Sequence, residues 1–201
     1  MSRAVTTSPA RIGLLFGSFN PIHTGHLILA NYMATHTDLS EVWLIVSPQS
    51  PYKVNQDLLP ETIRFSLVET AIGGNSRLRA VDLEFELPKP SFTITTLDEL
   101  GRLHPELEFV LLMGGDNLLG LAGWKDSERI QRDFDIYVYP RPGYSLPTQE
   151  NTSKRLRVVS APLLDISATF IRQCITAGKS IRYLVPEAVE QQIAAGGYWQ
   201  K

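Results

Sequence analysis

The 201-residue sequence has a single cysteine, Cys174, almost no net charge and no long apolar run. One cysteine excludes an internal disulfide and fits a reducing compartment. A formal charge of −2 and a pI near 6.1 argue against a general nucleic-acid-binding protein, which normally has a basic patch. No apolar stretch approaches the roughly 20 residues of a membrane span, and the N-terminus lacks the apolar segment of a signal peptide. We therefore predict a cytoplasmic protein without a nucleic-acid or membrane partner.

The sequence also lacks internal repeats, low-complexity tracts and any linker long enough to divide it. With 43% hydrophobic residues, a chain of this length suits one globular domain with a continuous core. We predict a flexible N-terminus over residues 1–10 and one domain over residues 11–201. The oligomeric state stays open, and a homo-oligomer is one of the alternatives.

Short apolar runs alternate with amphipathic segments along the chain. Alternation of this kind predicts an α/β fold, here a Rossmann-like, doubly wound parallel sheet with helices on both faces. Ligands of such sheets bind at the carboxyl ends of the strands, near the point where the strand order reverses. The predicted strands are 12–16, 41–47, 78–85, 107–113, 134–139 and 155–159. The predicted helices start at 27 and cover 60–72, 91–101, parts of 117–132, 166–177 and 187–195, and residues 141–154 are predicted to be a surface loop.

A glycine-containing turn with two histidines follows the first predicted strand and leads into the first predicted helix. Backbone N–H groups in the first turn of a helix have no intrahelical partner, and they carry the positive end of the helix dipole. Small residues at Gly17, Ser18 and Gly25 allow a phosphate to approach the backbone closely. His23 and His26 are three residues apart and can point the same way. The turn is therefore a candidate anion site.

Two other interpretations of the histidines are weaker. Isolated histidines at a helix start are most often structural, but these two lie where an anion site is physically expected. A zinc site would need further ligands, and the sequence has neither an HExxH pattern nor a nearby Cys/His partner. The turn also differs from the ATPase phosphate loop and from the G-x-G-x-x-G dinucleotide fingerprint. Phosphate binding is the preferred interpretation, and no residue is predicted to be a metal ligand.

A second candidate anion site lies at the start of a later helix. Ser167, Thr169 and Arg172 place two hydroxyls and a guanidinium within the first turns, although Ser and Thr are also ordinary helix caps. Two such sites in one α/β chain suggest a polyphosphate held between them. Lys53 and Arg141 follow strands on proline-containing loops and could add positive charge, although loop cations are usually solvated.

Two further residues are placed where a nucleotide would bind. Asp116 directly follows the strand at 107–113, so its carboxylate can cap a helix or accept hydrogen bonds from a ribose. Trp124 can be a core residue or an aromatic wall for a flat ring. Cys174 lies in an apolar helical pattern and is predicted to be inert core. Because no nucleophile with a paired base is present, covalent catalysis is not expected.

Together these residues resemble a known family. Residues 17–26, GSFNPIHTGH, are similar to the first signature of the nucleotidyltransferase α/β phosphodiesterase superfamily, and residues 166–172, ISATFIR, to its second signature, ISSTxIR. Within the superfamily the chain resembles the bacterial nicotinate-nucleotide adenylyltransferases. Further matches lie at 91–97, 114–116, 124, 139–143 and 183–186. The chain departs from the family pattern at Tyr52, Thr95, Ala168 and Lys125; Lys125 stands where relatives often have Tyr or another large residue.

The resemblance implies adenylyl transfer from ATP to nicotinate mononucleotide, giving nicotinate adenine dinucleotide and pyrophosphate by direct in-line transfer, with Mg²⁺ accompanying ATP. It implies that His23 and His26 are the catalytic residues. The ATP phosphates would be bound by the backbone of Gly17, Ser18 and Phe19 and by Lys53, Ser167, Thr169 and Arg172. The pyridine mononucleotide would be bound by Thr93, Thr96, Asp116, Trp124 and Arg141.

Two alternatives to this function remain at the level of sequence. The same fold can serve nicotinamide mononucleotide or another phosphorylated acceptor such as phosphopantetheine. A non-catalytic nucleotide sensor is the alternative from a different class, although a sensor would not need both histidines and Arg172. Nicotinate and nicotinamide are hard to separate, because backbone N–H groups can recognise a carboxylate without leaving a mark in the sequence.

Overall fold

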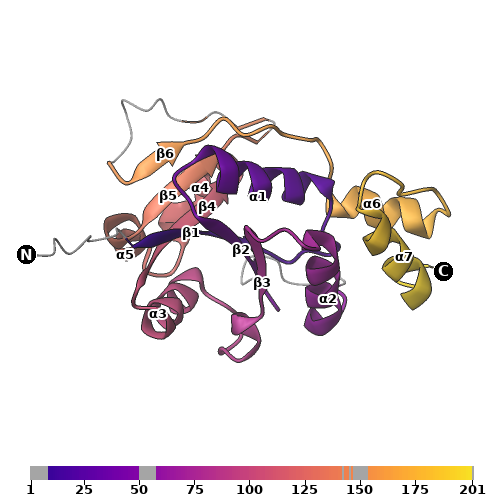
Figure 1. The fold of residues 1–201 in the computed structure, drawn as a ribbon, viewed down its shortest axis with the longest axis horizontal. Coiled ribbons are helices and arrows are strands. Elements are labelled where there is room, and N and C mark those ends of the chain that lie inside the picture. Colours follow the sequence, from indigo (N-terminus) through magenta and orange to yellow (C-terminus); the bar gives the residue numbers. More distant parts are fainter. Residues whose placement is uncertain (1–8, 50–57, 142, 145, 147–153, 201) are drawn as a thin grey trace, which may run out of the picture.

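The computed structural model describes residues 9–49, 58–141, 143, 144, 146 and 154–200. Its centre is a six-stranded sheet in the order β3-β2-β1-β4-β5-β6 (Figure 1), and every neighbouring pair is parallel. The order reverses between β1 and β4, so the predicted doubly wound parallel sheet is confirmed. The strands are β1 Ala10–Gly17, β2 Glu41–Val46, β3 Leu78–Val81, β4 Leu107–Gly114, β5 Asp135–Tyr139 and β6 Leu156–Val158.

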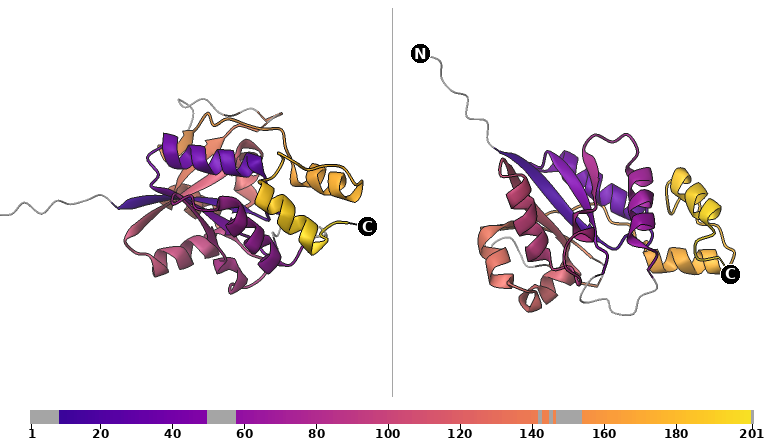
Figure 2. Two further views of the ribbon diagram at one scale, coloured as in Figure 1. Left: turned by 45° about the vertical axis from the view of Figure 1, so that its right-hand side comes forward. Right: turned by 90° about the horizontal axis from the view of Figure 1, so that it is seen from below.

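Helices connect the strands, with α1 and α3 on opposite faces of the sheet (Figures 1 and 2). The predicted helices are all present, and Ser167 caps α6 as expected. The helices are α1 Thr24–His36, α2 Glu61–Ile72, α3 Thr93–Leu103, α4 Gly115–Gly120, α5 Ser127–Asp133, α6 Ala168–Thr176 and α7 Glu187–Gly196, with short 3₁₀ turns η1 Leu83–Phe85 and η2 Leu121–Gly123.

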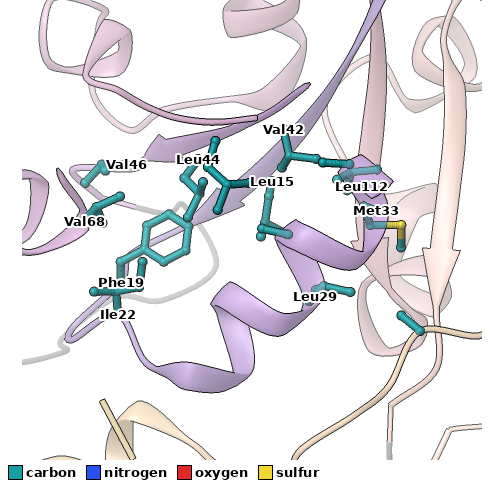
Figure 3. Packing of buried hydrophobic residues seen from close by; sticks show 14 of the residues in the cluster. Leu15, Phe19, Ile22, Leu29, Met33, Val42, Leu44, Val46, Val68 and Leu112 are labelled. Atoms are coloured by element: carbon teal, nitrogen blue, oxygen red, sulfur yellow. The ribbon is translucent and has the colours of Figure 1, made fainter. Parts of the chain in front are cut away.

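Two hydrophobic clusters cover the two faces of the sheet, because successive strand residues point to opposite sides. Along β1, Leu15 packs with side chains of α1, whereas Leu14 packs with side chains of α3. Figure 3 shows the first cluster, in which Phe19 and Ile22 from the turn after β1 extend the core beneath that turn. Cys174 also lies buried in this cluster, as predicted.

Several predicted boundaries differ from the structure; α1, for example, begins at Thr24 and not at 27. The strand predicted over 78–85 ends at Val81, because Asp82 leaves the extended conformation and the chain makes the η1 turn, which buries Glu84. The third helix passes Gly101 and ends at Leu103; one glycine costs a helix only about 1 kcal/mol. The N-terminal prediction for 1–10 lies mostly outside the described residues, although Ala10 already belongs to β1. Most of the loop predicted at 141–154 also lies outside them.

The last two helices stand at the carboxyl end of the sheet, beside α2 (Figures 1 and 2). Gln192 of α7 is held to α2 on both sides of its amide: it accepts a hydrogen bond from the Thr70 hydroxyl at 2.7 Å, and its amide nitrogen lies 2.9 Å from the Ser66 hydroxyl. This docking brings the residues before α6 to the same end of the sheet as the turn after β1. No described helix is long and apolar enough to cross a membrane.

Candidate active site

A cavity of about 370 Å³ opens at the carboxyl end of the sheet, where the strand order reverses. Gly17 ends β1, Ser47 follows β2 and Asp116 follows β4, so three strands deliver residues to it. The other side of the cavity is formed by the start of α3 and by the segment after η2. Its lining includes Phe16, Ser18, Glu84, Ser91, Phe92, Thr93, Asn117, Gly120, Trp124 and Lys125.

The turn after β1 has a backbone that only a few residues can adopt. Phe19 has a φ of 44°, in the left-handed region, and its ring is buried in the core below the turn. A Cβ at Gly17 would stand 2.8 Å from that ring, so no larger residue fits there. Ser18 lines the cavity between these two residues. The buried side chain of Phe19 therefore holds in place the turn whose Gly17 and Ser18 line the cavity.

A buried arginine that the sequence analysis missed supports the same turn. Arg64 of α2 is 1% exposed and donates hydrogen bonds to the carbonyl oxygens of Ser18 at 2.5 Å and Ser47 at 2.8 Å. It also donates to the carbonyls of Leu59 and Pro48, at 2.8 and 3.0 Å. Burial lowers the pKa of Arg64 from its usual value. Burying a cation is costly unless its donors are hydrogen-bonded, and these four carbonyls accept hydrogen bonds from the guanidinium. Arg64 in turn joins the loops after β1 and β2.

A signal for Arg64 was present in the sequence. Position 64 lies three and four residues before Leu67 and Val68, on the apolar face that α2 buries. A charged residue within an apolar stripe is rarely buried unless it has partners. Its partners, however, come from loops that the sequence does not place next to the helix.

The two histidines stand together at the start of α1. Their rings are stacked, with centroids 3.7 Å apart and planes 28° from parallel. The backbone N–H of His23 donates to Nδ1 of His26 at 3.3 Å. Since Nδ1 accepts this hydrogen bond, a neutral His26 ring carries its hydrogen on Nε2. The edge contact with Phe19, 5.1 Å between centroids, further fixes the orientation of the His26 ring.

His23 is the more buried of the pair. Its side chain lies in the protein interior, and its Nδ1 atom has no hydrogen-bond partner among the described residues. Burial, with a smaller contribution from the positive charge of Arg141, lowers the pKa of His23 to about 4. His23 is therefore neutral at pH 7 in the protein without ligand. A Cβ at Gly25 would approach its Nδ1 to 3.1 Å, so the glycine leaves room for the ring.

The second predicted anion site is joined directly to the first. Arg172 of α6 donates from Nη1 to the backbone carbonyl of Asn20 at 2.8 Å and from Nη2 to the Thr169 hydroxyl at 3.3 Å. Ser167 caps α6 and accepts a hydrogen bond from the Phe170 N–H at 3.2 Å. The structure thus brings together two helix starts that are far apart in the sequence.

The segment 183–186 also holds the start of α1. The Thr24 N–H donates to the carbonyl of Leu184 at 2.9 Å, and the Thr24 hydroxyl donates to the carbonyl of Tyr183 at 3.1 Å. These bonds satisfy groups at the helix start and leave the histidine side chains uninvolved. They explain how a segment between α6 and α7 helps to position the first motif.

Asp116 and Arg141 form an ion pair near both the cavity and the histidines. Arg141 Nε lies 3.7 Å from Asp116 Oδ1, and both side chains are partly exposed. A Cβ at Gly114 would approach Asp116 Oδ1 to 2.3 Å and Arg141 Cγ to 3.0 Å, so the pair depends on this glycine. Arg141 also lies over the ring of Tyr139, 5.7 Å from its centroid. Asp116 lines the cavity, and the charge of Arg141 acts on His23.

A buried carboxyl, that of Glu84, lines the cavity near the start of α3. Thr96 is fully buried and donates from its hydroxyl to Glu84 Oε1 at 2.7 Å, so this hydroxyl is used within the protein. Burial raises the pKa of Glu84, while the Thr96 hydrogen bond opposes the shift. Thr93, Ser91 and Glu84 line the cavity, whereas Thr96 does not. The sequence analysis missed Glu84 because it expected a regular strand there.

An aromatic residue, Trp124, and a cationic residue, Lys125, also line the cavity. Trp124 is half-buried and packs against the second hydrophobic cluster, so the two predicted roles, core residue and aromatic wall, both stay open. Lys125 lies next to it, with Nζ 4.9 Å from the centroid of the Phe92 ring. Lys53, which was predicted to add charge at the phosphates, lies outside the described residues.

The donor set of the described residues fits a magnesium ion that arrives with a polyphosphate. Among these residues, no group of three or more His, Cys, Asp or Glu side chains gathers around one point. Mg²⁺ needs no such cage, since it usually binds phosphate oxygens and water with at most one or two carboxylates. Asp116, in the first turn of α4 just after β4, is a carboxylate of this kind that lines the cavity.

The sequence comparisons with known proteins agree with one another on the family of this chain. Residues 14–174 match the model of the cytidylyltransferase-like family. A protein of Cytophaga hutchinsonii named probable nicotinate-nucleotide adenylyltransferase is 51% identical over 189 residues, covering 94% of this chain and 98% of its own. A protein of the same name from Bacteroides fragilis is 45% identical, with 91% of this chain and 90% of its own covered.

Solved structures share the fold. A Plasmodium falciparum nicotinic acid mononucleotide adenylyltransferase complexed with NaAD superposes with a TM-score of 0.79 at 17% identity, over 94% of this chain and 97% of that one. A Vibrio parahaemolyticus structure described as a putative nicotinate-nucleotide adenylyltransferase gives a TM-score of 0.70 at 21% identity, covering 94% and 95% of the two chains. The topology is therefore retained where most of the sequence has changed.

Proposed function

Because this chain belongs to the cytidylyltransferase-like family and groups within it with the nicotinate-nucleotide adenylyltransferases, we propose that it transfers the adenylyl group of ATP to nicotinate mononucleotide. The products are nicotinate adenine dinucleotide and pyrophosphate, and the reaction belongs to NAD biosynthesis. We assign the protein to the cytoplasm, where a reducing environment suits its single buried thiol.

The reaction is a direct displacement at phosphorus. A 5′-phosphate oxygen of the mononucleotide attacks the α-phosphorus of ATP and forms the new phosphoanhydride bond. The bond from the α-phosphorus to the oxygen that bridges to the β-phosphorus breaks, and this oxygen leaves with pyrophosphate. No covalent intermediate on the protein is required, so the protein acts by alignment and by stabilising charge.

The start of α1 supplies groups for the developing charge. A neutral His26 carries its hydrogen on Nε2, so it can donate a hydrogen bond to a phosphate oxygen. His23 is neutral for the reason given above, and it too acts as a donor of hydrogen bonds. The backbone N–H groups of Gly17 to Phe19 are assigned to the same phosphates.

The start of α6 supplies the second half of the phosphate site. Arg172 is held in place by hydrogen bonds to the Asn20 carbonyl and the Thr169 hydroxyl, and its guanidinium brings a positive charge to the start of α6. With Ser167 and Thr169 it is assigned to the β- and γ-phosphates. Mg²⁺ bound to ATP neutralises phosphate charge and favours the departure of pyrophosphate. Thr93, Asp116, Trp124 and Arg141 are assigned to the mononucleotide, and Thr96 to support of that side through Glu84.

One observation carries this proposal. Arg172 donates to the carbonyl of Asn20, so the positive ends of two helix dipoles meet at the turn after β1, and Gly17 and Ser18 of this turn line the cavity that Trp124 also lines. Such an arrangement suits a triphosphate between the helix starts and a flat ring in the cavity.

The test incubates the purified protein with ATP, Mg²⁺ and one acceptor at a time, and measures released pyrophosphate. The acceptors are nicotinate mononucleotide, nicotinamide mononucleotide and phosphopantetheine, and His26→Ala is the inactive control. We expect fastest release with nicotinate mononucleotide and a loss of at least a hundredfold in the variant. Nucleotide binding without pyrophosphate release from any acceptor would identify a sensor instead, and wild-type turnover by His26→Ala would refute the mechanism.

A further inference from the structure

We propose that Lys125 selects the acid form of the pyridine mononucleotide over the amide form, by pairing its ammonium with the ring carboxylate. The inference rests on the proposed function, which places the pyridine ring against Trp124. The two acceptors differ at one group: nicotinate carries a negative carboxylate at neutral pH, and nicotinamide carries a neutral amide. A nearby cation distinguishes them by charge.

The charges that line the cavity favour this assignment. Among the described residues that line it, the ionisable side chains are Glu84, Asp116 and Lys125, so Lys125 is the one cation. Asp116 has Arg141 as its partner, and Glu84 is buried with a hydrogen bond from Thr96. Lys125 forms no salt bridge with a described residue. Lys125 is therefore a lining cation with no salt bridge to a described acidic side chain, and it can pair with an anionic substituent of a ligand.

The ammonium of Lys125 lies over an aromatic face. Lys125 Nζ lies 4.9 Å from the centroid of the Phe92 ring, which is within the range of a cation–π contact. Phe92 caps α3, and Thr93, the first residue of that helix, lines the same cavity. Trp124 precedes Lys125 and supplies the flat wall. Trp124 and Lys125 are neighbours in the chain and line one cavity, so a ring packed on the indole shares that cavity with the ammonium.

Lys125 is an exposed residue, and this exposure limits how strongly its charge can select the acid mononucleotide over the amide. Water and salt screen a charge pair at such a site, so selectivity should be moderate and should fall as ionic strength rises. A lysine that is only solvated would show neither effect. The salt dependence therefore separates recognition of charge from simple packing on Phe92.

The experiment compares wild type with Lys125→Met, Lys125→Arg and Lys179→Met. Lys179 is exposed in the turn after α6, away from the cavity, so its variant is the matched control for loss of one surface charge. We measure kcat/KM for nicotinate mononucleotide and for nicotinamide mononucleotide at low and high salt. Calorimetry gives the Kd of each mononucleotide without turnover, and circular dichroism checks the fold.

We expect Lys125→Met to lower the acid-to-amide ratio of kcat/KM about fivefold, through a higher KM and Kd for the acid form. Lys125→Arg should keep most of the ratio, Lys179→Met should match wild type, and added salt should lower the ratio in wild type but not in Lys125→Met. A ratio in Lys125→Met within threefold of wild type would overturn the inference while leaving the proposed function intact. Absence of pyrophosphate release by wild type with either acceptor would overturn the proposed function itself.

Discussion

Acidification should destabilise this protein through His23. The folded protein holds the pKa of this histidine near 4, whereas the unfolded chain has the usual value of 6.5. Between these two values the unfolded chain binds more protons, so folding stability is fully present above about pH 6.5 and is lost as the pH falls towards 4. Since a tenfold change in proton affinity is worth about 1.4 kcal/mol, the complete loss is about 3 kcal/mol, of which about 2 kcal/mol has occurred by pH 5.

Urea unfolding at several pH values between about 8 and 4 measures this loss. His23→Asn removes the titrating ring and keeps a side chain that caps helices well, so the variant should fold. The difference in unfolding free energy between wild type and His23→Asn cancels the titration of the other groups. His36→Asn is the matched control, because His36 lies exposed at the other end of α1. A difference that stays constant within about 0.5 kcal/mol from pH 8 to 5 would refute the reasoning.

Three further predictions concern Arg64, Arg172 and Trp124. Arg64→Met leaves four carbonyls without their donor and should cost about 3–5 kcal/mol in urea unfolding, whereas Arg102→Met, at an exposed ion pair, should cost under about 1 kcal/mol. An Arg64→Met loss below about 1 kcal/mol would contradict its role in joining the loops. Arg172→Ala should raise the KM for ATP about tenfold or more, and an unchanged KM would remove this arginine from the site. Trp124→Ala should raise the KM for the pyridine mononucleotide more than that for ATP; the reverse order would exclude stacking.

Most of the fold was predictable because its signals are local. The apolar runs of β1, β2 and β4 and the boundaries of α2 depend on neighbouring residues and on short stop signals such as Gly73. The prediction failed at β3, where the apolar pattern continues past Val81 although the chain turns. The turn occurs because Glu84 meets Thr96 of α3, and a contact between residues distant in sequence leaves no periodic pattern.

The candidate site divides in the same way. The sequence alone placed both helix starts, and the strand ends suggested that Asp116 would reach the ligand side of the sheet; the structure has Asp116 lining the cavity. It did not reveal Arg64, whose meaning depends on four carbonyls from three loop segments. Nor did it reveal the environment of His23, since burial, which sets the pKa of this histidine, is a property of the folded chain.

The sequence by itself thus determined which segments are strands and helices and which residues could meet an anion, because propensity, periodicity and motif spacing are properties of neighbouring residues. Only the tertiary structure decided that Arg172 donates a hydrogen bond to the Asn20 carbonyl, that Thr96 donates one to Glu84, and that the Lys125 ammonium lies over the Phe92 ring at the cavity. Those relations depend on how helices dock at the carboxyl end of the sheet, and packing of distant segments sets both the distances and the burial that give each charged group its chemistry.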